Sequence, residues 1–319
     1  MRLPARHYTG SAKKADAQRA PTCAVGLGGT ADQWEPQIEY FKQQPDFQFI
    51  VFDNRGMGFS DPVAGRWTTT KMARDTLALL DYHGWKSNVH IVGLSMGGMI
   101  SQETVRQDPK RFASMTLLST IAGGPFSLGL FILAIPTGLR LTLQTFTAST
   151  GRDQLKNGLK LLYPAAFLDG TSPHPETGEP TSNFKLFRSA LIRRGVQAVK
   201  DGMPPQRFSS IVKQGFAVMT HNVTTSELQA LSKLLGGNTL VVTGDEDILV
   251  HPRNAYRLTD GLRAELIVLP GAGHGANEQV CYCSISGQLT PCNNKKKKPQ
   301  YAREVNQAIE RKVLIASKL

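Results

Sequence analysis

The sequence predicts an α/β fold in which a mostly parallel sheet carries helices on both faces and is interrupted by a helical insertion. Short apolar and β-branched runs alternate with helical spacing up to about residue 123, and the alternation resumes at about residue 234. The stretch between them, 124–233, has helical patterns separated by loops rich in Pro and Gly. Alternating strands and helices are typical of a parallel sheet that is covered on both faces.

The individual elements follow from the spacing of apolar residues. We expect strands, taken in order, at 23–25, 47–52, 89–94, 114–119, 239–244 and 265–269. Helices are expected at 70–83, 96–107, 184–199, 208–219, 252–262 and 301–315. Residues 21–123 and 234–319 then form one core, and the insertion would cover the sheet edge at which open α/β sheets bind ligands.

Two segments do not fit this pattern. Residues 1–20 are polar and basic, and we expect them to be unstructured. Residues 280–300 form a 21-residue insertion between a glycine-rich loop and the last helix. This in-frame segment can begin with a GT codon at Val280 and end with CAG at Gln300, as a retained intron would. We interpret it as an artefact of gene annotation or splicing, with a lysine-rich surface loop as the alternative.

Composition and charge exclude several classes of protein. Apolar residues make up 40% and charged residues 19%, as in ordinary globular proteins. Of the net charge of +12, residues 1–20 carry +4 and Lys295–Lys298 another +4, so we predict no nucleic-acid face. No apolar run is long enough to span a membrane, no secretory signal opens the chain, and we expect a cytoplasmic protein. The four cysteines, Cys23, Cys281, Cys283 and Cys292, do not have the spacing of a metal site, so we predict none.

A serine follows the predicted strand 89–94 directly, in the pattern Gly93-x-Ser95-x-Gly97. A helical pattern begins at Met96, so the serine lies at a tight strand-to-helix turn. Glycines on both sides let strand and helix pack closely, and the helix N-terminus directs free N–H groups toward the hydroxyl. The pattern is that of a nucleophile elbow.

A serine hydroxyl is a weak nucleophile unless a base removes its proton and a carboxylate orients that base. The strand 265–269 leads into a glycine-rich loop with His274, which we predict to be the base; His251 is the alternative. Three acids follow the strand 239–244. We assign the orienting acid to Asp247, because an apolar segment follows it, whereas Asp245 and Glu246 fit a solvated turn.

Acyl transfer also needs donors for the developing oxyanion. One predicted donor is the backbone N–H of Met96, the residue after the serine. The other should come from a glycine-rich loop after an early strand. Gly26-Leu27-Gly28-Gly29 is such a loop, and we assign the second donor to the N–H of Leu27.

Together these motifs resemble those of α/β-hydrolase-fold proteins over 22–277. The resemblance rests on Gly26-Leu27-Gly28-Gly29 with Trp34, Asp53-Asn54-Arg55-Gly56-Met57-Gly58-Phe59-Ser60-Asp61, Gly93-Leu94-Ser95-Met96-Gly97-Gly98-Met99, Gly244-x-x-Asp247 and Gly271-x-Gly273-His274. It implies Ser95 as nucleophile, His274 as base, Asp247 as its partner, Leu27 and Met96 as oxyanion donors, and a cap domain formed by 124–233. The motifs are most similar to those of hydrolases from fungi and plants, and more distantly to enol-lactone hydrolases and methylesterases.

The predicted function is a serine hydrolase that cleaves carboxylic esters, thioesters or lactones of a small or lipophilic substrate. We expect no cofactor or metal and no nucleic-acid partner, and the predicted partner is a small ester or lipid-like substrate. Ser95 at the elbow argues against epoxide and haloalkane hydrolases, which need a carboxylate there. Two alternatives remain: a non-catalytic ligand-binding or interaction protein with the same fold, and an inactivated product of a hydrolase gene.

Overall fold

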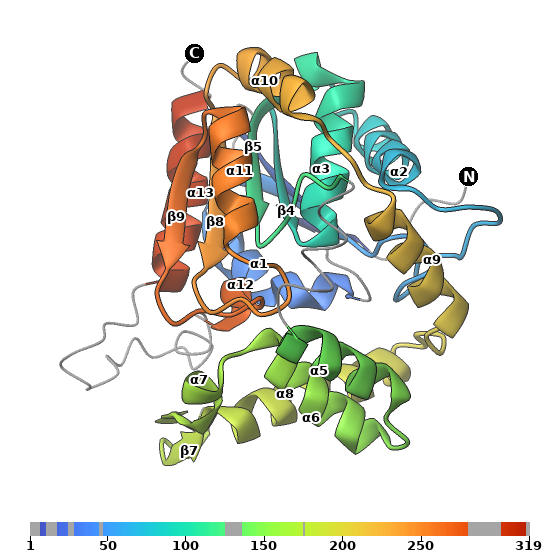
Figure 1. Cartoon of the computed structure of the whole chain (residues 1–319), viewed down its shortest axis with the longest axis vertical. Helices are drawn as coiled ribbons and strands as arrows, with labels where there is room; N and C mark the ends of the chain where they lie inside the picture. Colours follow the sequence, from blue (N-terminus) through green and yellow to red (C-terminus); the bar gives the residue numbers. More distant parts are fainter. Residues whose placement is uncertain are drawn as a thin grey trace.

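The computed structural model describes residues 7–10, 18–24, 29–44, 47–124, 136–174, 176–279 and 301–316. Its centre is a seven-stranded sheet in the order β1-β3-β2-β4-β5-β8-β9 (Figure 1). The strands are β1 (His7–Gly10), β2 (Gln18–Ala24), β3 (Phe47–Phe52), β4 (Val89–Leu94), β5 (Phe112–Leu118), β8 (Thr239–Gly244) and β9 (Glu265–Leu269). All neighbours pair in parallel except β1, which runs antiparallel to β3.

Helices cover both faces of the sheet, as the alternation of strands and helices predicts. Successive strand residues point to opposite faces: Val241 packs with one group of helices, and its neighbours Leu240 and Val242 pack with the other. On the first face lie α2 (Thr69–Tyr82), α3 (Met96–Gln107), α10 (Thr225–Leu234) and α11 (Arg253–Leu262). On the second lie α1 (Glu35–Lys42) and α13 (Tyr301–Ala316).

The strands at the centre of the sheet are buried along their whole length. Every residue of β4 and β8 is buried, whereas the edge strand β9 exposes Glu265 and Val268. A strand that is covered on both faces needs a continuous apolar and β-branched run rather than alternation. The predicted mostly parallel α/β sheet is therefore confirmed.

Between β5 and α10 the chain forms further elements, which we call the helical insertion (residues 136–219). Its last helix, Phe208–Met219, packs Ala217 with Met72 of α2 and Met96 of α3, and the elements before that helix form a separate layer. The insertion contains α5 (Pro136–Thr147), α6 (Gly151–Leu162), α7 (Ala165–Asp169), β6 (Thr171–Pro173), β7 (Pro180–Ser182), α8 (Asn183–Lys200) and α9 (Phe208–Met219). In Figure 1 the helices α5 to α8 lie beneath the core, on the side toward which the arrowheads of β8 and β9 point.

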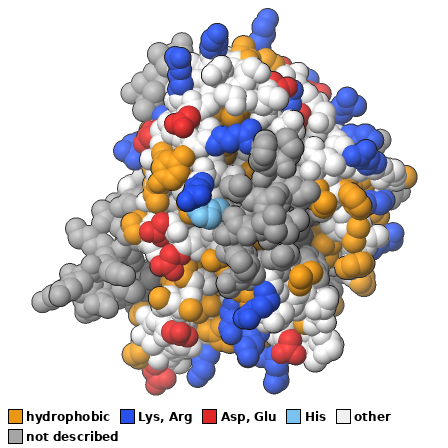
Figure 2. Space-filling model, in the orientation of Figure 1, with side chains coloured by type: hydrophobic (Ala, Val, Ile, Leu, Met, Phe, Trp, Pro, Cys, Tyr) orange, Lys and Arg blue, Asp and Glu red, His pale blue; other side chains and the backbone are white. Residues whose placement is uncertain are grey.

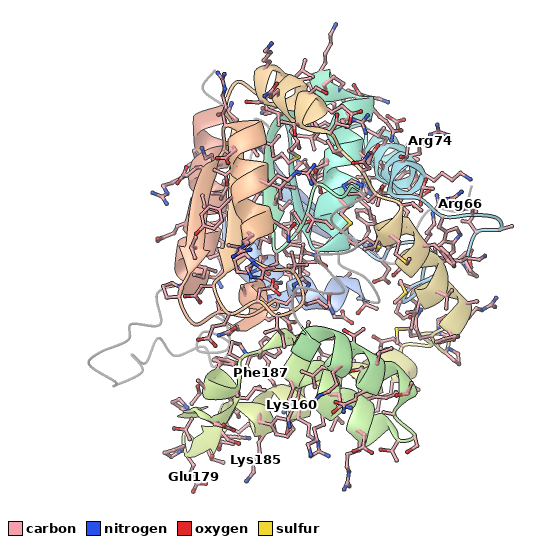
Figure 3. All side chains as sticks on the ribbon, in the orientation of Figure 1. Arg66, Arg74, Lys160, Glu179, Lys185 and Phe187 are labelled. Atoms are coloured by element: carbon pink, nitrogen blue, oxygen red, sulfur yellow. The ribbon has the colours of Figure 1, made fainter. Side chains whose placement is uncertain are left out.

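The helical insertion has its own apolar centre, made by Leu159, Tyr163, Leu168, Leu186 and Phe187. Figure 3 shows Phe187 on the side of this layer that faces the core, whereas Glu179 and Lys185 lie at its outer end. The helix α10, which the sequence places within 124–233, instead packs its Leu228 and Leu231 with the core helices and sheet. The domain limits at 124 and 233 stay predictions.

At the N-terminus the structure differs from the expectation. Residues 7–10 and 18–20 belong to strands, so the prediction of an unstructured segment over 1–20 is wrong at these positions. These residues are mostly polar and give no strand pattern in the sequence. Backbone pairing holds the short edge strand β1, as between His7 and Phe52, and β2 lies between β3 and β4. The segment 280–300 lies outside the described residues, and α13 begins directly after it.

On the face shown in Figure 2, lysines and arginines are spread among acidic and apolar side chains. Lys295–Lys298, to which the sequence assigns part of the basicity, lie outside the described residues. Among the helices that are described, none combines the length and apolar character needed to cross a membrane.

Candidate active site

The turn between β4 and α3 holds Ser95 in a backbone conformation that side-chain-bearing residues rarely adopt. Its φ is 55° and its ψ is −121°, and such values are maintained only where the surroundings enforce them. The Ser95 N–H donates to Leu118 O at 2.9 Å, and the Thr120 hydroxyl donates to Ser95 O at 2.6 Å. The end of β5 therefore holds both sides of the serine backbone.

Two glycines near Ser95 are required by close contacts. A Cβ on Gly93 would lie 2.4 Å from Gly97 O and 2.5 Å from Ser101 Oγ. A Cβ on Gly98 would lie 2.6 Å from the Thr120 side chain. Any larger residue would separate α3 from the strands beside it, so these glycines let the helix begin directly behind the serine.

Asp247 and His274 form a buried hydrogen-bonded pair. His274 Nδ1 lies 2.9 Å from Asp247 Oδ2, and the two residues are 4% and 2% exposed. The other carboxylate oxygen, Asp247 Oδ1, accepts the backbone N–H groups of Leu249 at 2.9 Å and Val250 at 2.8 Å. The carboxylate orientation is thus fixed by the backbone, and only Oδ2 is directed at the imidazole.

The loops that carry this pair are packed against each other. Glu246 N donates to Ala272 O at 3.0 Å, and Gly271 N donates to Asp245 Oδ1 at 2.6 Å. A Cβ on Gly244 would lie 2.1 Å from Ala272 O. Asp245 and Glu246, the alternative acids, are exposed, and Asp245 has this structural role instead.

The other histidines considered in the sequence lie elsewhere. His251 accepts the Arg253 N–H at 3.1 Å in the turn before α11, and the described residues show no carboxylate bonded to it. His90 contacts Ser114 Oγ at 2.8 Å, and burial lowers its pKa to about 4. His221 contacts Thr69 Oγ1 at 3.0 Å; burial, followed by the nearby Arg106, lowers its pKa to about 3.

Strand order brings the predicted site residues to one edge of the sheet. Ser95 follows β4, Asp247 follows β8 and His274 follows β9, and these strands run parallel within the order β4-β5-β8-β9. The carboxyl ends of parallel strands share an edge, which is where such sheets bind ligands. The helical insertion lies on this side (Figure 1).

Of the two predicted oxyanion donors, the structure describes only Met96. Met96 is fully buried and is the first residue of α3, so its N–H has no acceptor within the helix. Leu27 lies outside the described residues. Near the segment that contains it, Asp53 accepts the Ala31 N–H at 2.7 Å and the Phe59 N–H at 3.1 Å, joining the start of η1 (Ala31–Trp34) to the loop after β3.

The loop after β3 owes its shape to buried polar contacts that sequence reasoning missed. Arg55 forms a bidentate ion pair with Asp75 of α2, at 2.6 and 2.7 Å. Burial raises the pKa of Asp75, and the hydrogen bonds from Arg55 oppose that rise. Gly58 has a φ of 51°, and a Cβ there would lie 2.2 Å from Asp53 Oδ2. Asp53 can therefore keep this position only if residue 58 has no side chain.

The described part of the chain contains no group of three or more His, Cys, Asp or Glu side chains that could hold a metal ion. The chemistry available at this edge is that of a hydroxyl, an imidazole, a carboxylate and backbone N–H donors.

Comparison with known proteins agrees with this architecture. The alpha/beta hydrolase fold family matches residues 23–279. The chain belongs to this family. Its predicted fold class and family resemblance are thereby confirmed, and the chain is a member of the hydrolase superfamily.

Individual relatives of this hydrolase-fold chain have modest sequence identity and match only part of their length. It is 33% identical over 96 residues to 3-oxoadipate enol-lactonase 2 of Acinetobacter baylyi, a stretch covering 30% of the chain and 35% of the lactonase. It is 26% identical to the dihydrolipoyllysine-residue acetyltransferase component of the acetoin cleaving system of Pseudomonas putida, over 78% of the chain and 56% of that protein. The matched stretches thus span about a third to just over half of these relatives.

Among solved structures, a thermophilic esterase from Thermogutta terrifontis aligns with a TM-score of 0.64 and 18% identity, covering 98% of this chain and 93% of that one. At this identity the likeness concerns the fold alone.

Proposed function

We propose that this protein is a serine hydrolase that cleaves carboxylic ester, thioester or lactone bonds through Ser95, His274 and Asp247. The observation that carries the proposal is the buried Asp247–His274 hydrogen bond of 2.9 Å at the sheet edge that also holds Ser95 in its φ of 55°. A nucleophile, a base and an orienting acid that follow three parallel strands are the parts that acyl transfer requires.

In this mechanism the Ser95 hydroxyl attacks the substrate carbonyl while His274 Nε2 accepts its proton. Asp247 Oδ2 holds the Nδ1–H tautomer and stabilises the imidazolium that forms. The oxyanion accepts hydrogen bonds from the N–H groups of Met96 and Leu27. His274 then protonates the leaving alcohol, thiol or lactone oxygen, and water releases the acyl group by the same steps in reverse.

The nucleophile and the relatives support this substrate class. A neutral hydroxyl nucleophile with a histidine base suits activated acyl compounds, and one relative is named for an enol-lactone substrate. The chain between 126 and 146 is rich in Phe, Leu and Ile, which favours a small or lipophilic acyl group. In this proposal the helical insertion is a cap that selects what reaches Ser95, no cofactor takes part, and the protein acts in the cytoplasm without a nucleic-acid partner.

Labelling with a fluorophosphonate probe tests the proposal. The probe should form an adduct in the wild type that is absent in Ser95→Ala. Ser119→Ala is a matched control, because Ser119 also has a positive φ of 43° at the end of the neighbouring strand, but no helix begins behind it. Absence of an adduct in folded wild-type protein would instead support a non-catalytic or inactivated member of the family.

A substrate panel then separates the ester classes. We expect hydrolysis of p-nitrophenyl esters whose chain-length dependence reports the size of the acyl site. Enol-lactones and thioesters of matched acyl length would show which leaving group the site prefers. Equal loss of all these activities in Ser95→Ala would tie them to one site.

A further inference from the structure

The loop that carries His274 is in direct contact with the helical insertion. Leu162, the last residue of α6, accepts the Gly275 N–H through its carbonyl oxygen at 3.0 Å. The ring of Tyr163 packs so closely on the same glycine that a Cβ there would lie 2.6 Å from Tyr163 Cε1. On the other side of His274, a Cβ on Gly273 would lie 2.5 Å from Leu162 O.

These two glycines are not required by their own backbone conformation. Among the described glycines with positive φ, Gly271 of the same loop appears, but Gly273 and Gly275 do not. An alanine could adopt their φ and ψ, so the absent side chains are explained by the chain of the insertion that lies against them. The residues on both sides of His274 thus provide a contact surface for 162–164.

A buried polar network fixes this contact. The Tyr163 hydroxyl donates to Glu278 Oε2 at 2.6 Å. Glu278 belongs to the short helix α12 (Ala276–Gln279), four residues after His274. Its other oxygen, Oε1, accepts Arg194 Nη1 of α8 at 2.7 Å, and Arg194 Nη2 pairs with Glu35 of α1 at 2.7 Å. One carboxylate beside the His274 loop is therefore bonded to two elements of the insertion.

The protonation states suit this arrangement. Burial, and then the charge of Glu278, raises the pKa of Tyr163, so its hydroxyl stays a neutral donor. Burial lowers the pKa of Arg194, but the charges and hydrogen bonds of Glu278 and Glu35 more than offset this and raise it overall. Removing one partner of such a buried carboxylate leaves an uncompensated charge. The network should therefore act as a unit.

The core holds the same loop through a second set of contacts. Gln279 Oε1 accepts the Gly273 N–H at 2.8 Å, and Gln279 Nε2 donates to Gly271 O at 2.6 Å. The His274 loop thus has one set of contacts within the core and one with the insertion. The ring position of His274 depends on both sets, because the loop is short and the residues next to His274 are glycines.

We propose that Tyr163 and Glu278 are positioning residues that dock the helical insertion on the His274 loop and thereby set the place of the imidazole relative to Ser95. The proposal rests on the proposed function, in which His274 is the base. Neither side chain needs to touch substrate. Chemistry at Ser95 then requires a docked insertion, which links the layer that selects substrate to the group that activates the nucleophile.

The main test compares Tyr163→Phe with Tyr40→Phe. Both remove a hydroxyl bonded to a glutamate, but Tyr40 bonds Glu310 of α13 at 2.5 Å, away from the insertion. We expect Tyr163→Phe to lower kcat and the fluorophosphonate labelling rate by about ten- to a hundredfold, with a smaller change in KM, because displacement of a reacting group by about 1 Å has effects of this size. Glu278→Gln should behave similarly, and Tyr40→Phe should change neither rate.

A structural role alone would give another result. If the network contributed only to stability, Tyr163→Phe would lower Tm and leave kcat unchanged below the transition, as expected for Tyr40→Phe at its separate contact. That outcome would overturn the proposal. Proton NMR gives a second readout, since the downfield resonance of the His274 Nδ1–H should shift or broaden in Tyr163→Phe and stay in place in Tyr40→Phe.

The steric part is tested by a double-mutant cycle. Gly275→Ala should slow labelling in the wild-type background, because its methyl group meets the Tyr163 ring. In a Tyr163→Ala background the same methyl group should have little further effect. Equal penalties in the two backgrounds would contradict the proposed contact.

Failure of the proposed function and failure of the positioning role give different results. If the wild type gives no Ser95 adduct, the catalytic assignment fails, and the NMR comparison still decides the docking. A His274 resonance that responds to Tyr163→Phe but not to Tyr40→Phe supports the positioning role. A resonance that is unchanged in both variants refutes it.

Discussion

Replacing Asp247 by asparagine should remove nearly all activity while keeping the fold. Asp247 Oδ1 accepts two backbone N–H groups, from Leu249 and Val250, and Oδ2 faces His274 Nδ1. In Asp247→Asn the amide oxygen must stay at the Oδ1 position to keep both backbone bonds. The amide NH₂ then takes the Oδ2 position and donates to His274 Nδ1.

This geometry forces the wrong tautomer on the base. With Nδ1 as acceptor, the imidazole proton moves to Nε2, which can then no longer accept the proton of Ser95. The analogous change in serine proteases lowers kcat about 10⁴-fold, or about 5 kcal/mol in activation free energy. We expect a loss of this size because the two backbone donors exclude the flipped amide.

Steady-state hydrolysis of a p-nitrophenyl ester measures the effect, with thermal unfolding as a check on the fold. Glu246→Gln is the matched control, since this neighbouring carboxylate is exposed. If Asp247→Asn kept activity within tenfold of the wild type, the assignment of Asp247 as the orienting acid would be refuted. A similar loss in Glu246→Gln would move the assignment to the exposed acids.

Three further outcomes follow from the buried and strained groups. Because His90 has its pKa lowered to about 4, the unfolded chain binds more protons below pH 6.5, and stability falls as the pH drops from 6.5 toward 4. His90→Asn should remove about 2 kcal/mol of this loss between pH 7.5 and pH 5, measured by urea titrations; an unchanged pH dependence would contradict it. Ser95→Gly should be more stable than Ser95→Ala by about 1 kcal/mol, because glycine adopts a φ of 55° without strain; equal midpoints would show that the turn is unstrained. Gly93→Ala should cost about 1–3 kcal/mol through its contact with Gly97 O, whereas Gly84→Ala, with open space around its Cβ but a φ of 68°, reports the backbone cost alone.

The core of the fold and part of the site could be predicted because they depend on local patterns. Buried strands such as β4 and β8 are continuous apolar runs, and the glycines around Ser95 are required by close contacts that any sequence with this turn must allow. The loops with Asp247 and His274 follow the parallel strands β8 and β9, so their place at the sheet edge follows from strand direction.

Other features depend on contacts between distant segments and leave no local pattern. The strand β1 is polar and is held by backbone pairing to β3. Helix α10 has an ordinary amphipathic pattern that does not reveal which layer it joins. Glu278 looks like a surface residue after a loop, and only the packing of α6 and α8 brings Tyr163 and Arg194 to it. The sequence gives one indication of this contact, namely a glycine on each side of His274.

The contact of Gln37 with two helices bears on how the end of the chain is connected. Gln37 Nε2 donates to Asn277 O of α12 at 3.2 Å and lies 3.4 Å from Asn306 Oδ1 of α13. These two residues precede and follow the segment 280–300, so one side chain in α1 holds both of its ends.

A connection whose ends are held at one point can be shortened without moving them. The entropy of closing a loop grows with the logarithm of its length, so replacing 280–300 by about six Gly and Ser residues should lower the closure cost by about 1 kcal/mol. The shortened chain should unfold at a higher urea concentration with α13 in place. The last helix would then owe its position to α1 and α12, whatever length of chain joins it to them.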